Sequence, residues 1–248
     1  MANQSETGHA KNVANFSTLI TVVNSFGAVY NPSKQAITPG ALAAQAGNAT
    51  NVMNLLNGAL GQSDIAIAAR VVAFEPMSKL ATRILNALRA SDVTDQIVDA
   101  AQSLVRKIQG KRATPKKTDE EKAALLAEGT SIKEVSSSQM SFDNRLDSFD
   151  KLIQLLSSIP QYAPNEEELK ITTLTNYYNT LKSTNAAAIE AETRLSNARL
   201  SRNEILHKTD SGLVDIAASV KIYVKSLFGA TSAQYKQISG LAFKSEKV

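Results

Sequence analysis

The chain contains only two histidines, and each follows a glutamate by three positions: Glu6 precedes His9, and Glu204 precedes His207. Residues at i and i+3 share a helix face, and two such Glu-x-x-His motifs with two further glutamates bind a di-iron centre in helical bundles. However, Glu6 and His9 lie in a polar N-terminal stretch, and Leu206 occupies the inward face that His207 would need. We therefore expect solvated pairs at both motifs, with no metal and no cofactor.

Other combinations of residues that could perform catalysis are missing. The chain has no cysteine, which excludes disulfides, thiolate metal sites and cysteine nucleophiles. It has no glycine-rich phosphate-binding loop, and two peripheral histidines cannot support a Ser-His-Asp arrangement. Asp143, Asp147 and Asp150 would share one helix face, but this face points away from the apolar positions and indicates a solvated acidic stripe. We therefore expect that the protein is not an enzyme.

One segment of the chain is strongly basic, although the net charge of the whole chain is only +4. Clustered cations can neutralise phosphates and bind nucleic acids without sequence preference. No aromatic residues for base stacking are interleaved, and Asp119, Glu120 and Glu121 follow at once. The ordinary interpretation is a helix C-terminus followed by a soluble linker, and anion or nucleic-acid contact is the alternative. The six cations are Arg106, Lys107, Lys111, Arg112, Lys116 and Lys117.

The elements that would position these groups are helices, and the clearest of them begins after Thr38. Thr38 can cap a helix whose first residue is Pro39, and an apolar seam with a spacing of three or four residues follows. Asn57-Gly58 leaves a hairpin as the alternative, but the apolar phase does not slip across it, so the sequence predicts one unbroken helix over 39–74. The seam is Leu42, Ala46, Ala49, Met53, Leu56, Leu60, Ser63, Ile67, Val71 and Phe74, of which Leu42, Met53, Leu56, Leu60, Ile67 and Phe74 are the candidate packing residues.

Apolar periodicity predicts further helices on both sides of the basic segment. Asn165 and Glu168 form a capping-box pattern that would start a second long helix, ending near His207. Gly110 and Gly229 provide helix stops. The remaining helices are expected over 10–26, 77–88, 93–108, 140–159 and 212–228. We divide the chain into a disordered tail (1–9), N-terminal helices (10–110), a charged linker (111–131), C-terminal helices of the same bundle (132–229) and a C-terminal tail (230–248).

The sequence contains one internal echo. Ile20–Gln35 and Ile222–Gln237 align without gaps, with seven identities in sixteen positions. Both segments combine the end of a helix with the turn after it, so similar stop chemistry explains much of the match. A true duplication is the alternative, but the match does not continue at a repeat period.

Four stretches of the sequence carry a resemblance to other proteins. They are Phe74–Leu88, Gln139–Leu146, Tyr162–Glu166 and Val224–Ser232. In these stretches the chain resembles a group of uncharacterised bacterial all-helical proteins of similar length, and the likeness covers most of the chain. The resemblance implies a bacterial origin and a single unit on both sides of the linker, and it implies no activity, cofactor or site.

Composition and pattern together predict an all-α fold. Aromatic residues make up only 5% of the chain, so alanine and leucine must fill the core between closely packed helices. We expect an elongated bundle of six or seven helices, with two long, antiparallel helices, that works as a structural or protein-interaction module and self-assembles or binds a protein partner. The most apolar run, Ile65–Phe74, contains Arg70 and is too short to span a membrane. The polar N-terminus carries no signal-peptide pattern, so we expect a cytoplasmic location, with leaderless export left open.

Overall fold

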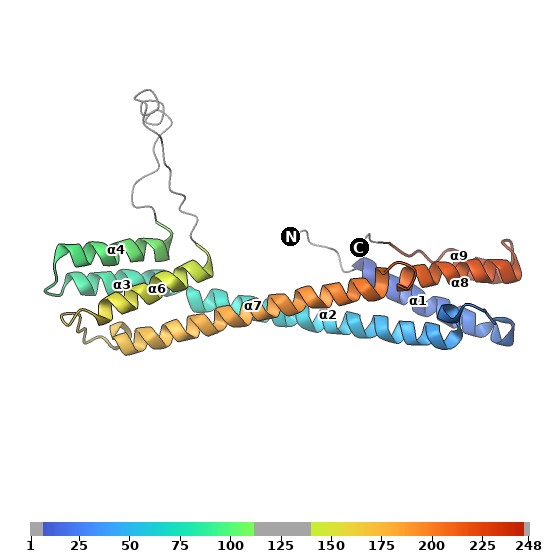
Figure 1. Cartoon of the computed structure of the whole chain (residues 1–248), viewed down its shortest axis with the longest axis horizontal. Helices are drawn as coiled ribbons and strands as arrows, with labels where there is room; N and C mark the ends of the chain where they lie inside the picture. Colours follow the sequence, from blue (N-terminus) through green and yellow to red (C-terminus); the bar gives the residue numbers. More distant parts are fainter. Residues whose placement is uncertain (1–6, 112–139, 246–248) are drawn as a thin grey trace, which may run out of the picture. The chain divides into compact units, whose positions relative to one another are not determined.

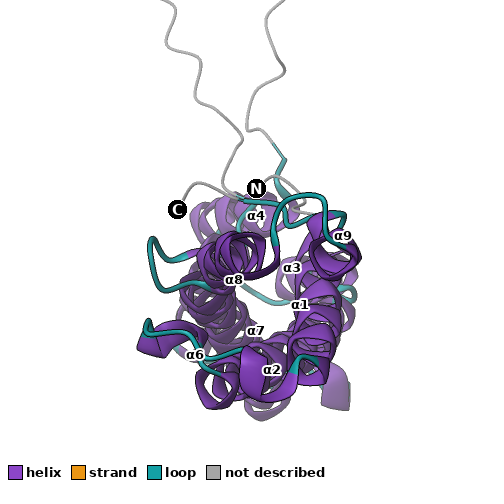
Figure 2. Ribbon diagram, turned by 90° about the vertical axis from the view of Figure 1, so that its right-hand side faces the viewer, coloured by secondary structure: helices purple, strands orange, loops and turns teal. Residues whose placement is uncertain are grey.

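The computed structural model describes residues 7–111 and 140–245, and these ranges contain helices and no β-strand (Figures 1 and 2). Within them, seven helices are longer than a dozen residues, which confirms the predicted all-α class. The antiparallel course of the two long helices and the elongated shape of the bundle stay predictions. The seven helices are α1 (Thr7–Ser25), α2 (Pro39–Phe74), α3 (Met77–Arg89), α4 (Asp95–Gln109), α6 (Phe142–Ser157), α7 (Ile171–His207) and α8 (Leu213–Phe228). Shorter elements are the 3-10 turns η1 (Gly27–Val29), η2 (Gln35–Ile37) and η3 (Glu167–Leu169), and the short helix α9 (Ala233–Ser239).

Helix α2 is unbroken over 36 residues, so the predicted continuous helix is confirmed and the hairpin at Gly58 is wrong. Of the candidate packing residues, Leu42, Leu56 and Phe74 are buried, whereas Met53, Leu60 and Ile67 are half-buried. Val71 is a correction to the seam, because 54% of its surface is exposed. Two successive steps of four residues lead from the buried Ser63 to Val71, and at 3.6 residues per turn they place Val71 about 80° around the helix from Ser63. Phe74 lies within about 20° of Ser63 and is buried.

The second long helix, α7, begins later than the capping-box pattern predicts. Residues 167–169 form the turn η3, and Lys170 is extended, with φ −65° and ψ 142°, so the helix starts at Ile171. Glu168 does not cap a helix at Asn165; its carboxylate pairs instead with the guanidinium of Arg83 on α3. The first long helix starts in the same way: the turn η2 is followed by the extended Thr38, with φ −66° and ψ 152°, and α2 begins at Pro39. The late start therefore belongs to a turn that precedes both long helices.

Within the described residues, parts of both predicted tails are helical. Helix α1 begins at Thr7, so residues 7–9 are helical although we expected them in the disordered tail. The predicted C-terminal tail contains the helix α9, whose Ile238 is buried. The stop at Gly110 is confirmed: its φ of 66° lies in the left-handed region that favours glycine. Apart from Lys111, the predicted linker over 111–131 lies outside the described residues.

The chain folds into two compact units whose boundaries fall inside the two long helices. The first unit extends to Asp64 and resumes at Ala191, and the second covers Ile65–Glu190. The first unit therefore holds α1, η2, the N-terminal part of α2, the C-terminal part of α7, α8 and α9. The second unit holds α6, η3, the N-terminal part of α7, the C-terminal part of α2, α3 and α4. Each unit thus contains a part of both long helices, a 3-10 turn and three further helices.

Matching residues occupy the cores of the two units. An identical interval in residue number separates Tyr30 from Tyr162, Ile37 from Leu169, Leu42 from Leu174 and Ala49 from Leu181, and all eight residues are buried. A second constant interval relates α3 to α8, since it separates Met77 from Leu213, Ala81 from Ala217, Ile84 from Val220 and Leu88 from Val224, which are also buried. The buried pattern is therefore repeated, even where the residue types differ.

Hydrogen bonds repeat with the same interval. The hydroxyl of Tyr30 donates to the carbonyl oxygen of Ile37 at 2.8 Å, and the hydroxyl of Tyr162 donates to that of Leu169 at 3.0 Å. In the first unit, the side-chain amide of Gln45 donates to the carbonyl of Ile205 at 3.0 Å, and its counterpart Tyr177 donates to the carbonyl of Ala73 at 2.8 Å in the second. The two units are therefore two versions of one arrangement.

The internal echo in the sequence does not mark this repeat. Ile20–Gln35 begins in α1, whereas Ile222–Gln237 begins in α8. Helix α1 corresponds to α6, and α8 corresponds to α3, so the two echoing segments are not counterparts. Their similarity fits the shared helix-stop chemistry that the sequence suggests.

Candidate functional site

The described part of the basic segment lies at the C-terminus of α4. Arg106 and Lys107 belong to the last helical turn, and Lys111 follows the left-handed Gly110. Lys107 and Lys111 are exposed and Arg106 is half-buried. Cations at this position interact favourably with the helix dipole, so a local structural role accounts for them. The other three candidate cations, Arg112, Lys116 and Lys117, lie outside the described residues.

Asp143 and Asp147 of α6 have different partners, and the third aspartate, Asp150, is half-buried. The carboxylate of Asp147 pairs with Lys151 at 2.6 Å on the exposed surface. Asp143 accepts a hydrogen bond from the side-chain amide of Asn185 on α7 at 2.7 Å. These contacts make Asp147 part of a solvated helix face and give Asp143 a positioning role between α6 and α7.

The two histidines meet in the first unit, which the sequence analysis did not foresee. Nδ1 of His9 lies 3.1 Å from Nε2 of His207, and the rings are arranged edge to face. His9 is only 2% exposed, so the expectation of a solvated side chain is wrong there. A signal was present, since His9 continues the inward spacing of Phe16 and Leu19 with Asn12 between them.

This histidine pair does not assemble the di-iron ligand set within the described residues. Glu6 lies outside them, and the carboxylate of Glu204 pairs with Lys208 at 3.0 Å. The described ranges hold no group of three or more His, Asp or Glu side chains placed to bind one metal ion. In this part of the chain, the pair joins the start of α1 to the end of α7.

A polar clamp on α1 holds the segment after α9. The side-chain amide of Asn12 donates to the carbonyl of Lys244, and the backbone N–H of Lys244 donates back to Asn12, both at 2.9 Å. Asn15 donates to the carbonyl of Ala242 at 2.6 Å. From α8, the ammonium of Lys221 donates to the carbonyl of Leu241, and burial lowers its pKa. The side chains of Asn12, Asn15 and Lys221 therefore provide hydrogen-bond partners for backbone groups of residues 241–244, which belong to no helix.

The second unit exposes an apolar face on α2. We call Ile65, Ala68, Ala69 and Val72 the outer face of α2: they are spaced i, i+3, i+4 and i+7, and all four are exposed. The exposed fractions of Ile65 and Val72 are 73% and 66%. Arg70, the one charged residue of this stretch, is half-buried and donates to the side-chain oxygen of Asn185 at 3.4 Å. The outer face consequently carries no charge of its own.

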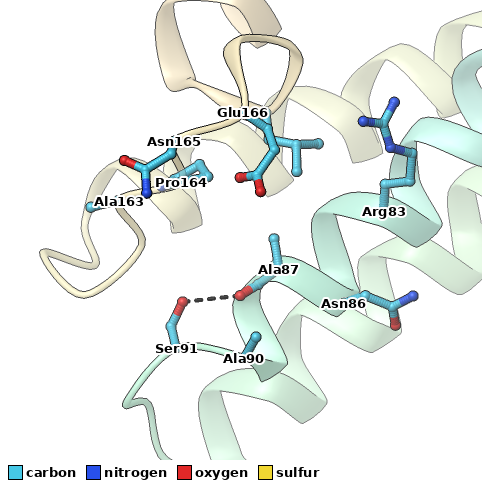
Figure 3. A pocket seen from close by; sticks show the side chains of 10 residues that line it. Arg83, Asn86, Ala87, Ala90, Ser91, Ala163, Pro164, Asn165 and Glu166 are labelled. Atoms are coloured by element: carbon cyan, nitrogen blue, oxygen red, sulfur yellow. Dashed lines mark hydrogen bonds between the residues drawn. The ribbon is translucent and has the colours of Figure 1, made fainter.

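The second unit also contains a pocket between α3 and the loop that leads to η3 (Figure 3). Its volume is about 460 Å³. Small side chains of α3 form one wall, and the loop residues Pro164, Asn165 and Glu166 face them across the hollow. Nearby, burial raises the pKa of the Tyr162 hydroxyl to about 12, with a smaller contribution from the Glu166 carboxylate. The lining residues are Arg83, Asn86, Ala87, Ala90, Ser91, Ala163, Pro164, Asn165, Glu166 and Leu169.

Comparison with known proteins gives this chain no relative: no family model, curated protein or solved structure matches it. In the described ranges, none of the helices combines the length and apolar character needed to cross a membrane. Among the described residues, the outer face of α2, the pocket beside α3 and the basic end of α4 are surfaces with a distinct chemical character. Function has to follow from what these surfaces can bind.

Proposed function

We propose that the protein is a non-enzymatic interaction protein that self-associates through the outer face of α2. The observation that carries this proposal is the exposure of Ile65 and Val72 on one helix face with no charge between them. Contiguous exposed apolar surface is unfavourable in water, and where it is retained it commonly marks an interaction site.

A second copy of the same face is the occupant that the chemistry favours. Ala68 and Ala69 lie between Ile65 and Val72, and such small side chains let a partner helix approach closely. Because Arg70 turns inward, where its guanidinium lies 4.4 Å from the ring centre of Phe142, two copies of the face meet without like-charge repulsion. An uncharged, apolar face can therefore be complementary to itself, as two-fold symmetric dimers require.

The molar mass of the purified chain in solution, measured by light scattering over a wide concentration range, tests this proposal. We expect a dimer or larger species that dissociates on dilution, and Ile65→Lys or Val72→Lys should give a monomer with unchanged helical circular dichroism. Val29→Lys is the matched control, because Val29 is also exposed but lies on η1 in the first unit. A wild-type chain that is monomeric at every concentration contradicts the proposal.

The alternative is binding of nucleic-acid phosphates by the basic segment over 106–117. Its support is the charge pattern together with the exposure of Lys107 and Lys111. Affinity for a DNA duplex should then fall steeply with salt concentration, and replacing the six cations by glutamine should abolish it. Binding that ignores salt, or that survives the six replacements, excludes this alternative.

A further inference from the structure

The two units differ at one position that faces the loop before each long helix. In the first unit, Tyr223 of α8 lies edge to face against Tyr30, with ring centres 5.1 Å apart and planes at 87°. In the second unit, the counterpart of Tyr223 is Ala87 of α3, at the same constant interval that relates Ile84 to Val220. The phenol ring of Tyr223 in the first unit therefore corresponds to the methyl group of Ala87 in the second.

Polar contacts support the equivalence of the two loops. In the first unit, Lys34 of the loop before η2 donates to the hydroxyl of Ser219 on α8 at 3.0 Å. The counterpart of Ser219 is Arg83, which pairs with Glu168 of η3. In both units, a side chain of the loop region is thus tied to the equivalent position of the neighbouring helix.

The pocket of the second unit opens where Ala87 replaces a tyrosine. Ala87 of α3 and Ala90, directly after this helix, line one side of it, and Pro164 and Leu169 line it from the loop side. Figure 3 shows the carboxylate of Glu166 extending into the space above Ala87. The volume of about 460 Å³ falls within the range of small-molecule sites, about 300–1,000 Å³. The pocket therefore has a mixed lining, in which the apolar groups of Ala87, Ala90 and Pro164 lie among the polar side chains of Asn86, Asn165 and Glu166.

We propose that this pocket binds a single neutral ring of the phenol type, in the place that corresponds to the side chain of Tyr223. The alanine, proline and leucine side chains would cover the ring, while the Glu166 carboxylate or the Asn165 amide would accept a hydrogen bond from its hydroxyl group. This inference goes beyond the proposed self-association and does not depend on it, because the outer face of α2 does not line the pocket.

The charges around the pocket select against an anionic ring. Arg83, the cation of the lining, is already paired with Glu168, and Glu166 adds a negative charge at the rim. An aromatic carboxylate would have to share Arg83 with Glu168 and would meet the negative charge of Glu166, whereas a neutral phenol would do neither. The ligand class is thus a neutral hydroxyphenyl group.

Titration of the full chain with p-cresol, followed by NMR chemical shifts, tests the proposal. We expect saturable binding in the millimolar range at one site per chain, and clearly weaker binding of the saturated analogue 4-methylcyclohexanol. Ala87→Tyr should fill the pocket and weaken p-cresol binding by about tenfold or more. Ala100→Tyr is the matched control, since Ala100 is an exposed alanine of α4 and does not line the pocket.

A reverse substitution keeps the proposal falsifiable if Ala87→Tyr does not fold. Tyr223→Ala should open the corresponding hollow against Tyr30, so that the chain binds two molecules of p-cresol instead of one. Tighter binding of N-acetyltyrosine amide than of p-cresol would identify the phenol as a tyrosine side chain of a polypeptide, whereas equal or weaker binding would identify a free phenol. Equal binding of p-cresol and 4-methylcyclohexanol, or unchanged binding by a folded Ala87→Tyr variant, overturns the proposal.

Discussion

Nδ1 of His9 lies within hydrogen-bond distance of Nε2 of His207, at 3.1 Å, although 198 positions separate the two residues along the chain. In such a contact one ring donates an N–H group and the other accepts it, so the pair joins the beginning of α1 to the end of α7. The contact belongs to the first unit, and His9 itself is buried.

Replacing His9 should therefore destabilise the first unit. We expect His9→Ala to lower the free energy of unfolding by about 1–3 kcal/mol, because it removes one partner of a buried hydrogen bond. Urea unfolding followed by circular dichroism measures this change. His9→Gln, which keeps a donor and an acceptor, should recover part of the loss, and an unchanged midpoint for His9→Ala would show that the contact contributes nothing.

Two adjacent leucines of α2 provide a direct test of its buried face. Leu56 is completely buried, whereas 60% of the surface of Leu55 is exposed. Leu56→Ala should cost about 2–5 kcal/mol of unfolding free energy, since it leaves a cavity in packed surroundings. Leu55→Ala should change it by about 0.5 kcal/mol or less. Similar losses for both variants would mean that the face of α2 is wrongly assigned.

The polar clamp should control the order of the segment after α9. Asn12→Ala removes both hydrogen bonds to Lys244. We therefore expect faster amide hydrogen exchange at residues 241–245 and a free energy of unfolding that is lower by about 1–3 kcal/mol. Asn24→Ala is the control, because Asn24 is exposed on the same helix. Hydrogen exchange measured by mass spectrometry distinguishes the two, and equal protection in both variants would contradict the clamp.

Buried tyrosines predict unfolding at alkaline pH. Burial raises the pKa of Tyr30, and the neighbouring Tyr223 raises it further. Burial also raises the pKa of Tyr162 to about 12, with a smaller contribution from the Glu166 carboxylate. For Tyr177, burial raises the pKa to about 12 although the charge of Arg145 acts to lower it. A phenol is neutral when protonated, so its stabilising contribution is complete below the unfolded pKa of 10 and is lost as the pH rises toward 12. Tyrosinate absorbance should rise together with loss of helical circular dichroism, and Tyr162→Phe should reduce this pH dependence. Ionisation of all tyrosines near pH 10 in a chain that stays helical would refute the assignment.

Local signals in the sequence determine most helices of this protein. Pro39 after Thr38 starts α2, Gly110 stops α4 in the left-handed conformation, and the uninterrupted apolar phase carries α2 across Gly58. These features depend on backbone preferences and on the burial of one helix face, both of which are readable from neighbouring residues. The late start of α7 escapes the capping-box pattern, because the turn η3 and the extended Lys170 lie between Asn165 and the first residue of the helix.

Tertiary packing alone decided how the units and sites are built. The unit boundaries near Asp64 and Ala191 fall inside α2 and α7, which continue through them without a break. Matching positions of the two units share burial more than residue identity. Alignment of the amino-acid sequence with itself therefore misses this repeat and finds instead the match between Ile20–Gln35 and Ile222–Gln237, which are not counterparts. Ala87, which lines the pocket, occupies the position equivalent to Tyr223, and this equivalence becomes visible only when the cores of the two units are compared. Side-chain contacts between distant residues depend on how helices pack, and no local sequence pattern encodes that choice.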